Sequence, residues 1–219
     1  MTDVTGALRR INPEILIEFR QSYVGPAIRK YGNMLRVADC PNDALRNRQD
    51  VVNLRLTSGT TAVHSDMLMW HRDDPVESAA LQLVSVLYSV PQISVRIEGL
   101  PEDHKEMLAF YLAFWRENRE LLLDGTIRAE NPETAYSAVT AEKGGKAIVT
   151  VYTNPVVDLA AYTRAVVVNA WRDDALVLHH AKGKAYRVLS CKGELVSCGT
   201  VDAELAEIRV PLSGMVAIG

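Results

Sequence analysis

The chain has 219 residues, of which 48% are hydrophobic, 23% charged and 6% aromatic, and its formal net charge is −3. These values are typical of a globular protein and argue against a disordered, collagen-like or low-complexity chain. No run of basic residues indicates binding to nucleic acid or to an anionic membrane. The longest apolar stretch is far shorter than the ~20 residues of a membrane span. The first residues lack the layout of a signal peptide, so a cytoplasmic protein is expected.

The first part of the chain, up to about Gly125, alternates short apolar runs with segments of helical period. Strands are predicted at residues 15–19, 34–38, 61–64 and 92–97, and helical segments at residues 27–31, 42–56, 74–91 and 101–124. Four such strand–helix units are typical of a parallel α/β sheet. A closed eight-stranded barrel needs about 250 residues, so the pattern predicts half of a (β/α)8 TIM barrel.

Two helix ends carry clear local signals. Asp74 is predicted to be the N-cap of the third helix, with Pro75 at its first position and Glu77 completing a capping box. Gly125 is predicted to be the C-cap of the last helix.

After Gly125 the period changes to that of short strands separated by turn residues. Strands are predicted at residues 136–142, 146–153, 165–171, 176–179, 184–191, 194–201 and 207–212, the first two being joined at Gly144-Gly145. This pattern favours an antiparallel β-sandwich or jelly-roll-like domain. The chain is therefore expected to combine an α/β domain, residues 1–125, with an all-β domain, residues 126–219.

Polar residues cluster after the predicted strands of the first domain, and active sites of α/β barrels lie at these carboxyl ends. The candidates are Glu18, Arg20, Gln21, Arg36, Asp39, Asp43, His64, Asp66, His71, Arg96 and Glu98. Two carboxylates facing one rim are what glycoside hydrolysis requires. An acid in such a place is more often the N-cap of the next helix, and Asp43 is open to that interpretation.

Other chemistries have weaker support. Cys40 has no histidine near it in the sequence to act as a base, so the sequence does not favour a thiol nucleophile. His64, Asp66 and His71 could hold a metal only with further ligands. His179 and His180 are neighbours on one predicted strand, so their side chains are expected on opposite faces, which argues against a shared metal. We therefore expect neither a metal nor a cofactor.

Several segments together resemble the alpha-galactosidase (melibiase) clan, glycoside hydrolase families 27 and 36. The segment at residues 34–43, MLRVADCPND, looks like the strand that carries an aspartate of the clan, and residues 15–21 are similar to the strand before it. Residues 63–70 resemble a strand with the motif D-M-L. Residues 89–125 are similar to the closing strand and helix of those barrels, and the tail fits the clan's C-terminal β domain.

The resemblance implies a retaining hydrolase of alpha-galactosides that uses two aspartates. Asp39 matches the acid/base, which follows the sixth barrel strand. The clan's nucleophile lies in a K-x-D motif on the fourth strand, and this sequence contains no such motif. By the unit count the chain would supply strands five to eight, so it is expected to be a C-terminal fragment that is inactive alone. The residues expected to bind substrate are Glu18, Arg20, Arg36, Asp43, His64 and Asp66.

Two other functions stay open from the sequence. The chain could be a non-catalytic module that binds carbohydrate or a protein, or a different enzyme with a hydrolytic or metal site at Asp39, His64 and Asp66. A half barrel also exposes two sheet edges and an apolar face, so we expect a homodimer or a missing N-terminal half as partner. Arg20 and Gln21 stand where family 36 has a Cys/Gly-rich sugar-binding segment, which leaves the sugar undetermined.

Overall fold

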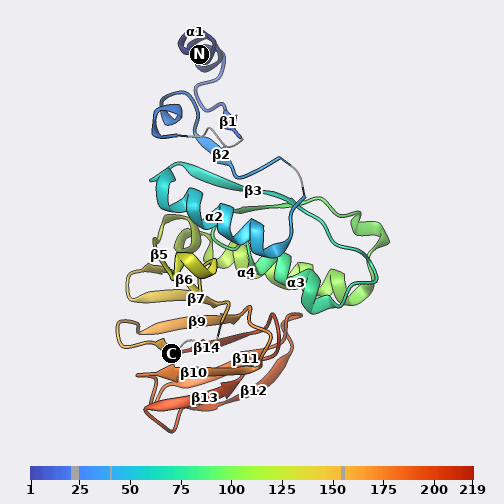
Figure 1. Cartoon of the computed structure of the whole chain (residues 1–219), viewed down its shortest axis with the longest axis vertical. Coiled ribbons are helices and arrows are strands. Elements are labelled where there is room, and N and C mark those ends of the chain that lie inside the picture. Colours follow the sequence, from blue (N-terminus) through green and yellow to red (C-terminus); the bar gives the residue numbers. More distant parts are fainter. Residues whose placement is uncertain (21–24, 40, 154–155) are drawn as a thin grey trace.

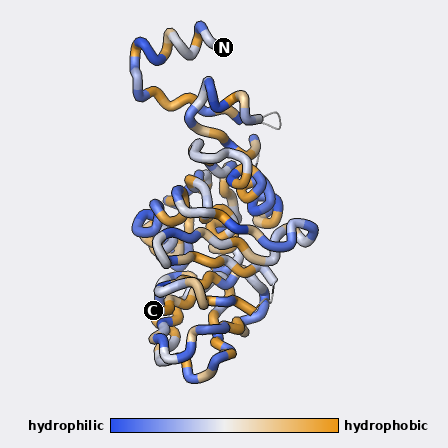
Figure 2. Tube along the Cα trace, turned by 90° about the vertical axis from the view of Figure 1, so that its left-hand side faces the viewer, coloured by the Kyte–Doolittle hydropathy of each residue, from blue (hydrophilic) through white to orange (hydrophobic). Residues whose placement is uncertain are grey.

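The computed structural model describes residues 1–20, 25–39, 41–153 and 156–219. The candidates Gln21 and Cys40 lie outside these residues. The chain begins with a helix, α1 (Thr2–Ile11), that the sequence analysis did not predict. Figures 1 and 2 both show α1 at the far end of the molecule from the large β-sheet. No helix among the described residues is long and apolar enough to cross a membrane.

The first half of the chain forms a parallel sheet whose four strands follow chain order. They are β1 (Glu18–Phe19), β2 (Met34–Arg36), β3 (Ala62–Leu68) and β4 (Val90–Ile93). The segments between and after them are η1 (Pro26–Lys30), α2 (Ala44–Ser58), α3 (Val76–Val84), η2 (Ile97–Gly99) and α4 (Glu102–Asp124). The predicted strand–helix order is thus observed, although β1 is shorter and β3 longer than predicted.

The predicted start of α3 is wrong in detail. The helix begins at Val76 with Pro75 as its N-cap, and no side chain caps it. The carboxylate of Asp74 instead accepts a hydrogen bond of 2.8 Å from the backbone N–H of His71, so it closes the preceding turn. At the other helix end, the prediction is correct: α4 ends at Asp124 and Gly125 is its C-cap.

The second half of the chain forms two further sheets. Their strands are β5 (Thr126–Glu130), β6 (Ala138–Lys143), β7 (Lys146–Val151), β8 (Val156–Asp158), β9 (Arg164–Asn169), β10 (Ala175–His179), β11 (Ala185–Leu189), β12 (Leu195–Thr200), β13 (Leu205–Arg209) and β14 (Met215–Ile218); η3 (Pro132–Thr134) follows β5. Seven strands form one sheet in the order β12-β11-β14-β9-β7-β6-β5, and β13-β10-β8 form the other.

The sequence pattern predicted purely antiparallel sheets, but these two sheets also contain parallel pairs. The pairs β7–β9 and β8–β10 are parallel, because the chain crosses over between them. β5, β8 and β14 were not predicted. The turn predicted at Gly144-Gly145 does join β6 to β7, and both glycines have positive φ, 58° and 74°. Residues with positive φ are what a tight hairpin turn requires.

The inner strands β6, β7 and β9 of the seven-stranded sheet are buried on both faces and lie between the helices and the three-stranded sheet. Along β7, Ile148 packs into a core with α3 and α4, whereas its neighbours Ala147 and Val149 pack into a second core with the three-stranded sheet. Successive side chains of a strand point to opposite faces, so one strand serves both cores. The helices of the first half are therefore packed directly on the sheet of the second half.

Buried tyrosines connect the two halves by hydrogen bonds as well. The hydroxyl of Tyr88 donates to the backbone oxygen of Val139 at 2.6 Å and lies 2.8 Å from Thr150 Oγ1. Burial raises the pKa of Tyr88 well above its usual value, so the hydroxyl stays protonated. On α4, the hydroxyl of Tyr111 donates to the backbone oxygen of Ser213.

Candidate functional site

One face of the parallel sheet carries a row of four polar side chains, those of Glu18, Arg36, His64 and Asp66. Arg36 on β2 is in register with His64 on β3, and Glu18 on β1 is in register with Met34, two residues before Arg36. In parallel strands, residues in register point to the same face, and so do residues two apart on one strand. Val63 and Ser65 point to the opposite face of β3 and are buried.

Within this row, Glu18 and His64 form one pair. His64 Nδ1 lies 2.9 Å from Glu18 Oε2, and both side chains are partly exposed. The two residues are 46 positions apart in the chain and meet only because β1 and β3 both border β2. An imidazole held by a carboxylate is a group that can donate or accept a hydrogen bond at its free nitrogen.

Arg36 and Asp66 form the second pair of the row. Arg36 Nη2 donates to Asp66 Oδ1 at 2.9 Å, and the side chain of Asp66 is fully buried. The Nε of Arg36 is also buried and has no hydrogen-bond partner among the described residues. A buried donor without a partner is uncommon, so this guanidinium has hydrogen-bonding capacity left.

The predicted acid/base, Asp39, lies beyond the carboxyl end of β2. Its carboxylate forms an ion pair with Arg20, which follows β1. Both side chains are close to half exposed. The structure thus places Asp39 and Arg20 together at the strand ends.

Asp43 caps a helix. It is the N-cap of α2, and its Oδ1 accepts a hydrogen bond of 2.8 Å from the backbone N–H of Arg46. Of the two interpretations open from the sequence, the structure shows the cap, and a contact of Asp43 with substrate stays a prediction.

We expect Asp43→Ala to lower the free energy of unfolding by about 1 kcal/mol, because an N–H of the first turn of α2 loses its acceptor. Asp43→Asn keeps an oxygen acceptor and is expected to restore most of this loss. Urea denaturation followed by circular dichroism measures both. Equal losses in the two variants would contradict a capping role.

The remaining sequence candidates lie apart from the row. His71 is exposed and its Nδ1 lies 3.4 Å from Asp73. Arg96 and Glu98 are exposed at η2. The sequence analysis missed His104 on α4, whose ring is buried between the indole of Trp70 (3.1 Å) and the backbone oxygen of Asp74 (3.0 Å).

Comparison with known proteins identifies the fold. No protein-family profile and no curated protein sequence matches the chain. The galactosidase domain of an alpha-galactosidase–sucrose kinase matches with a TM-score of 0.57 and 12% identity over 99% of this chain and 31% of that chain. A variant of a family 27 β-L-arabinopyranosidase from Geobacillus stearothermophilus, in complex with arabinose, matches with a TM-score of 0.58 and 10% identity over 100% of this chain and 54% of that one.

A family 36 alpha-galactosidase from Geobacillus stearothermophilus, in complex with raffinose, also matches, with a TM-score of 0.52 and 14% identity over 99% of this chain and 30% of that chain. The chain has the fold of a portion of these enzymes. The resemblance to the alpha-galactosidase clan is thus confirmed as a likeness of fold, and the mixed α/β class is confirmed with it. The chain spans between about a third and a half of the length of the enzymes that it matches.

Proposed function

We propose that the chain is the C-terminal portion of a retaining glycoside hydrolase of the alpha-galactosidase type. In this proposal residues 1–125 supply strands five to eight of a TIM barrel, and residues 126–219 form its C-terminal β-sandwich domain. The observation that carries the proposal is the match over 99–100% of this chain to only 30–54% of each enzyme. The four parallel strands in chain order support the same placement.

Asp39 is the residue that we propose as the acid/base. It stands at the carboxyl end of its strand, where barrel enzymes carry their chemistry, and its side chain is open to solvent. To protonate a leaving-group oxygen, Asp39 must first separate from Arg20, which then is free to bind a sugar hydroxyl. The partly exposed pair Glu18–His64 offers a further hydrogen-bonding group to a polar ligand.

The second carboxylate of a retaining mechanism must come from elsewhere. It lies about 5 Å from the acid/base in retaining enzymes, and the sequence contains no K-x-D motif to supply it. Among the described residues, β1 and β4 each pair with another strand on one side only. Both edges can accept further strands, from a second copy of the chain or from the missing half of a barrel. We therefore expect the chain alone to be inactive, or nearly so.

The test is hydrolysis of an aryl alpha-galactoside by the purified chain, with and without sodium azide, which can replace a missing nucleophile. We expect turnover that requires azide and is lost in Asp39→Asn. The matched control is Asp174→Asn, because Asp174 also forms an exposed ion pair with an arginine, Arg209, on the three-stranded sheet. Turnover without azide that is lost in Asp39→Asn would show that this chain already holds both carboxylates.

We also consider a second function, in which the chain is a non-catalytic module. Its polar row would bind carbohydrate, and no nucleophile would be needed. It predicts no turnover in any condition, together with galactoside binding that Arg36→Ala weakens and Asp174→Asn does not. Calorimetric titration with a galactoside separates this function from the first. The binding-module function is favoured if the Asp39→Asn variant binds the sugar with unchanged affinity and the parent chain shows no azide-dependent turnover.

A further inference from the structure

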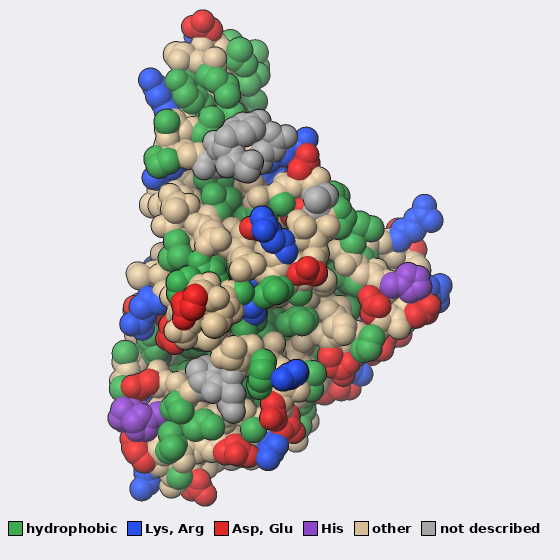
Figure 3. Space-filling view, in the orientation of Figure 1, with side chains coloured by type: hydrophobic (Ala, Val, Ile, Leu, Met, Phe, Trp, Pro, Cys, Tyr) green, Lys and Arg blue, Asp and Glu red, His purple; other side chains and the backbone are tan. Residues whose placement is uncertain are grey.

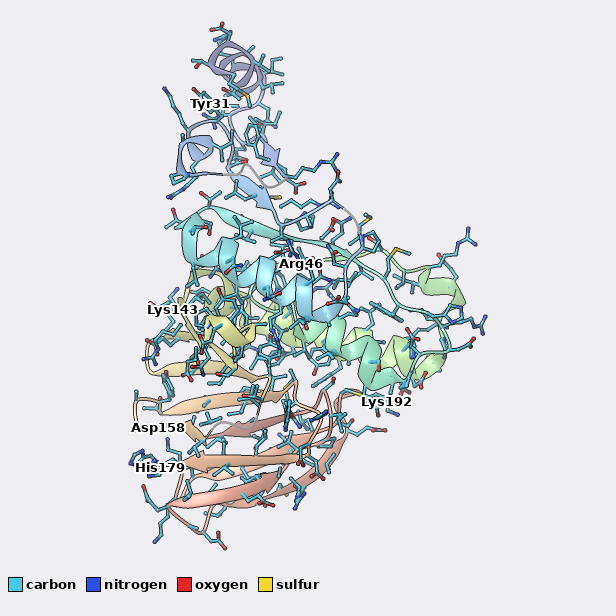
Figure 4. The ribbon with its side chains drawn as sticks, viewed as in Figure 1. Tyr31, Arg46, Lys143, Asp158, His179 and Lys192 are labelled. Atoms are coloured by element: carbon cyan, nitrogen blue, oxygen red, sulfur yellow. The ribbon has the colours of Figure 1, made fainter. Side chains whose placement is uncertain are left out.

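A cluster of two histidines and two acids lies at one end of the three-stranded sheet, far from the polar row. β8 ends at Asp158 and β10 ends at His179, and these two residues are partners in the parallel register. His180 follows directly, and Glu204 precedes β13, the third strand. Figure 4 shows Asp158 and His179 side by side at this edge, and Figure 3 shows histidine side chains exposed there next to acidic ones.

The two histidines point to the same side, contrary to the expectation from strand alternation. Their rings are stacked, with centroids 3.7 Å apart and planes 27° from parallel. The reason is that His180 has a φ of 58°, a left-handed conformation that ends the extended strand and reverses the alternation. A non-glycine residue in this conformation is uncommon and is found disproportionately at functional sites.

A carboxylate lies on each side of the two histidine rings, Asp158 on one side and Glu204 on the other. One ligand atom each of Asp158, His179 and His180 lies within 4.8 Å of the others, and His180 Nδ1 is 2.7 Å from Asp158 Oδ1. At the other edge, Glu204 Oε1 lies 3.7 Å from His180 Nε2 and 4.0 Å from His179 Nε2. Among the residues that the structure describes, this is the one group of three or more potential ligands that is close enough to hold an ion.

The backbone at this edge is held in place by hydrogen bonds. Leu159 N donates to the oxygen of His179 at 3.0 Å, and His180 N donates to the oxygen of Glu204 at 3.3 Å. The carboxylate of Asp158 also accepts from Ala160 N at 2.9 Å. The ligand-bearing positions of all three strands are therefore fixed by the sheet, while the exposed side chains can turn toward a common ion.

We propose that Asp158, His179 and His180 form a binding site for a divalent transition-metal ion, with Glu204 as the carboxylate that faces the other ring nitrogens. Imidazole and carboxylate ligands together suit Zn²⁺ and its neighbours, and an incomplete set of three leaves a position for water. A ligating histidine commonly gives its second N–H to a carboxylate, which is the place that Glu204 takes. The ion would join the ends of β8 and β10, and Glu204 would connect the histidine pair to the start of β13.

Calorimetric titration of the untagged chain with Zn²⁺ alone tests this site. We expect one saturable site, and a loss of affinity of about 10-fold or more in each of His179→Ala and His180→Ala. Glu204→Gln is expected to weaken binding less than either histidine variant. The matched control is His71→Ala, because His71 is also exposed beside an aspartate but lacks a second histidine. Cys198→Ser excludes the exposed thiol as the ligand.

Thermal unfolding supplies a second readout. Zn²⁺ is expected to raise the Tm of the parent chain and of the His71 and Cys198 variants, reversibly on addition of a chelator, and not that of the histidine-pair variants. Circular dichroism checks that these variants are folded, which their exposed positions favour. The proposal is overturned if the parent chain shows no saturable binding at millimolar Zn²⁺, or if both histidine-pair variants keep the parent affinity.

Discussion

Replacing Arg36 with alanine is expected to lower the free energy of unfolding by about 3 kcal/mol, because the change takes the guanidinium away from a carboxylate that water cannot reach. Asp66 is 0% exposed and Arg36 13% exposed, so their 2.9 Å ion pair is shielded from solvent. Urea denaturation at neutral pH measures the effect. The double variant Arg36→Ala with Asp66→Asn is expected to recover part of the loss, since the buried charge is then removed.

A second arginine–aspartate ion pair, which is exposed, serves as the control for this experiment. Arg20 and Asp39 form an ion pair at the same end of the sheet, but their side chains are 47% and 44% exposed. Exposed ion pairs contribute about 0–1 kcal/mol, so Arg20→Ala is expected to change stability little. If Arg36→Ala and Arg20→Ala were equally mild, the burial of Asp66 would not be what makes the first pair important.

Replacing Tyr88 with alanine is expected to destabilise the chain by about 3–5 kcal/mol, because it empties a large volume between the helices and the seven-stranded sheet. Tyr88→Phe keeps that volume and removes only the hydroxyl, which donates to Val139 and contacts Thr150, so a loss of about 1–2 kcal/mol is expected. Leu195→Ala is the control, because Leu195 is 55% exposed and its removal leaves no cavity.

The same experiment tests how the two halves of the chain unfold. Tyr88 lies in the first half and its hydrogen-bond partners lie on β6 and β7 of the second. We expect fluorescence of the tryptophans and circular dichroism of the sheets to report one common transition, shifted as a whole in Tyr88→Ala. Two separate transitions, with only one shifted by the substitution, would contradict a shared core.

These stability measurements also bear on the proposed function. Arg36 supports buried Asp66, so loss of sugar binding in Arg36→Ala must be measured under conditions where the variant is folded. Asp39 is exposed and not part of either core. A change of activity in Asp39→Asn can therefore be attributed to the carboxylate itself.

Local signals predicted the elements that depend on nearby residues. The period of α4 and the glycine at its end placed that helix within one residue of its observed bounds. The acid before α2 was correctly recognised as a possible cap, because a cap needs only a backbone N–H three residues away. Asp74 carries the same signal, but the turn at His71 takes its carboxylate instead. Two local contacts compete there, and the sequence does not rank them.

The sequence by itself determined the alternation of strands and helices in the parallel first half, the strand-rich second half and the set of polar residues at the strand ends, because each depends on spacing along the chain. Only the tertiary structure decided which of these residues meet. Glu18 and His64, or Arg36 and Asp66, are brought together by strand pairing across 46 and 30 residues. The stacked histidines depend on one left-handed backbone angle at His180. Such contacts arise from the packing of distant segments, which leaves no periodic trace in the sequence.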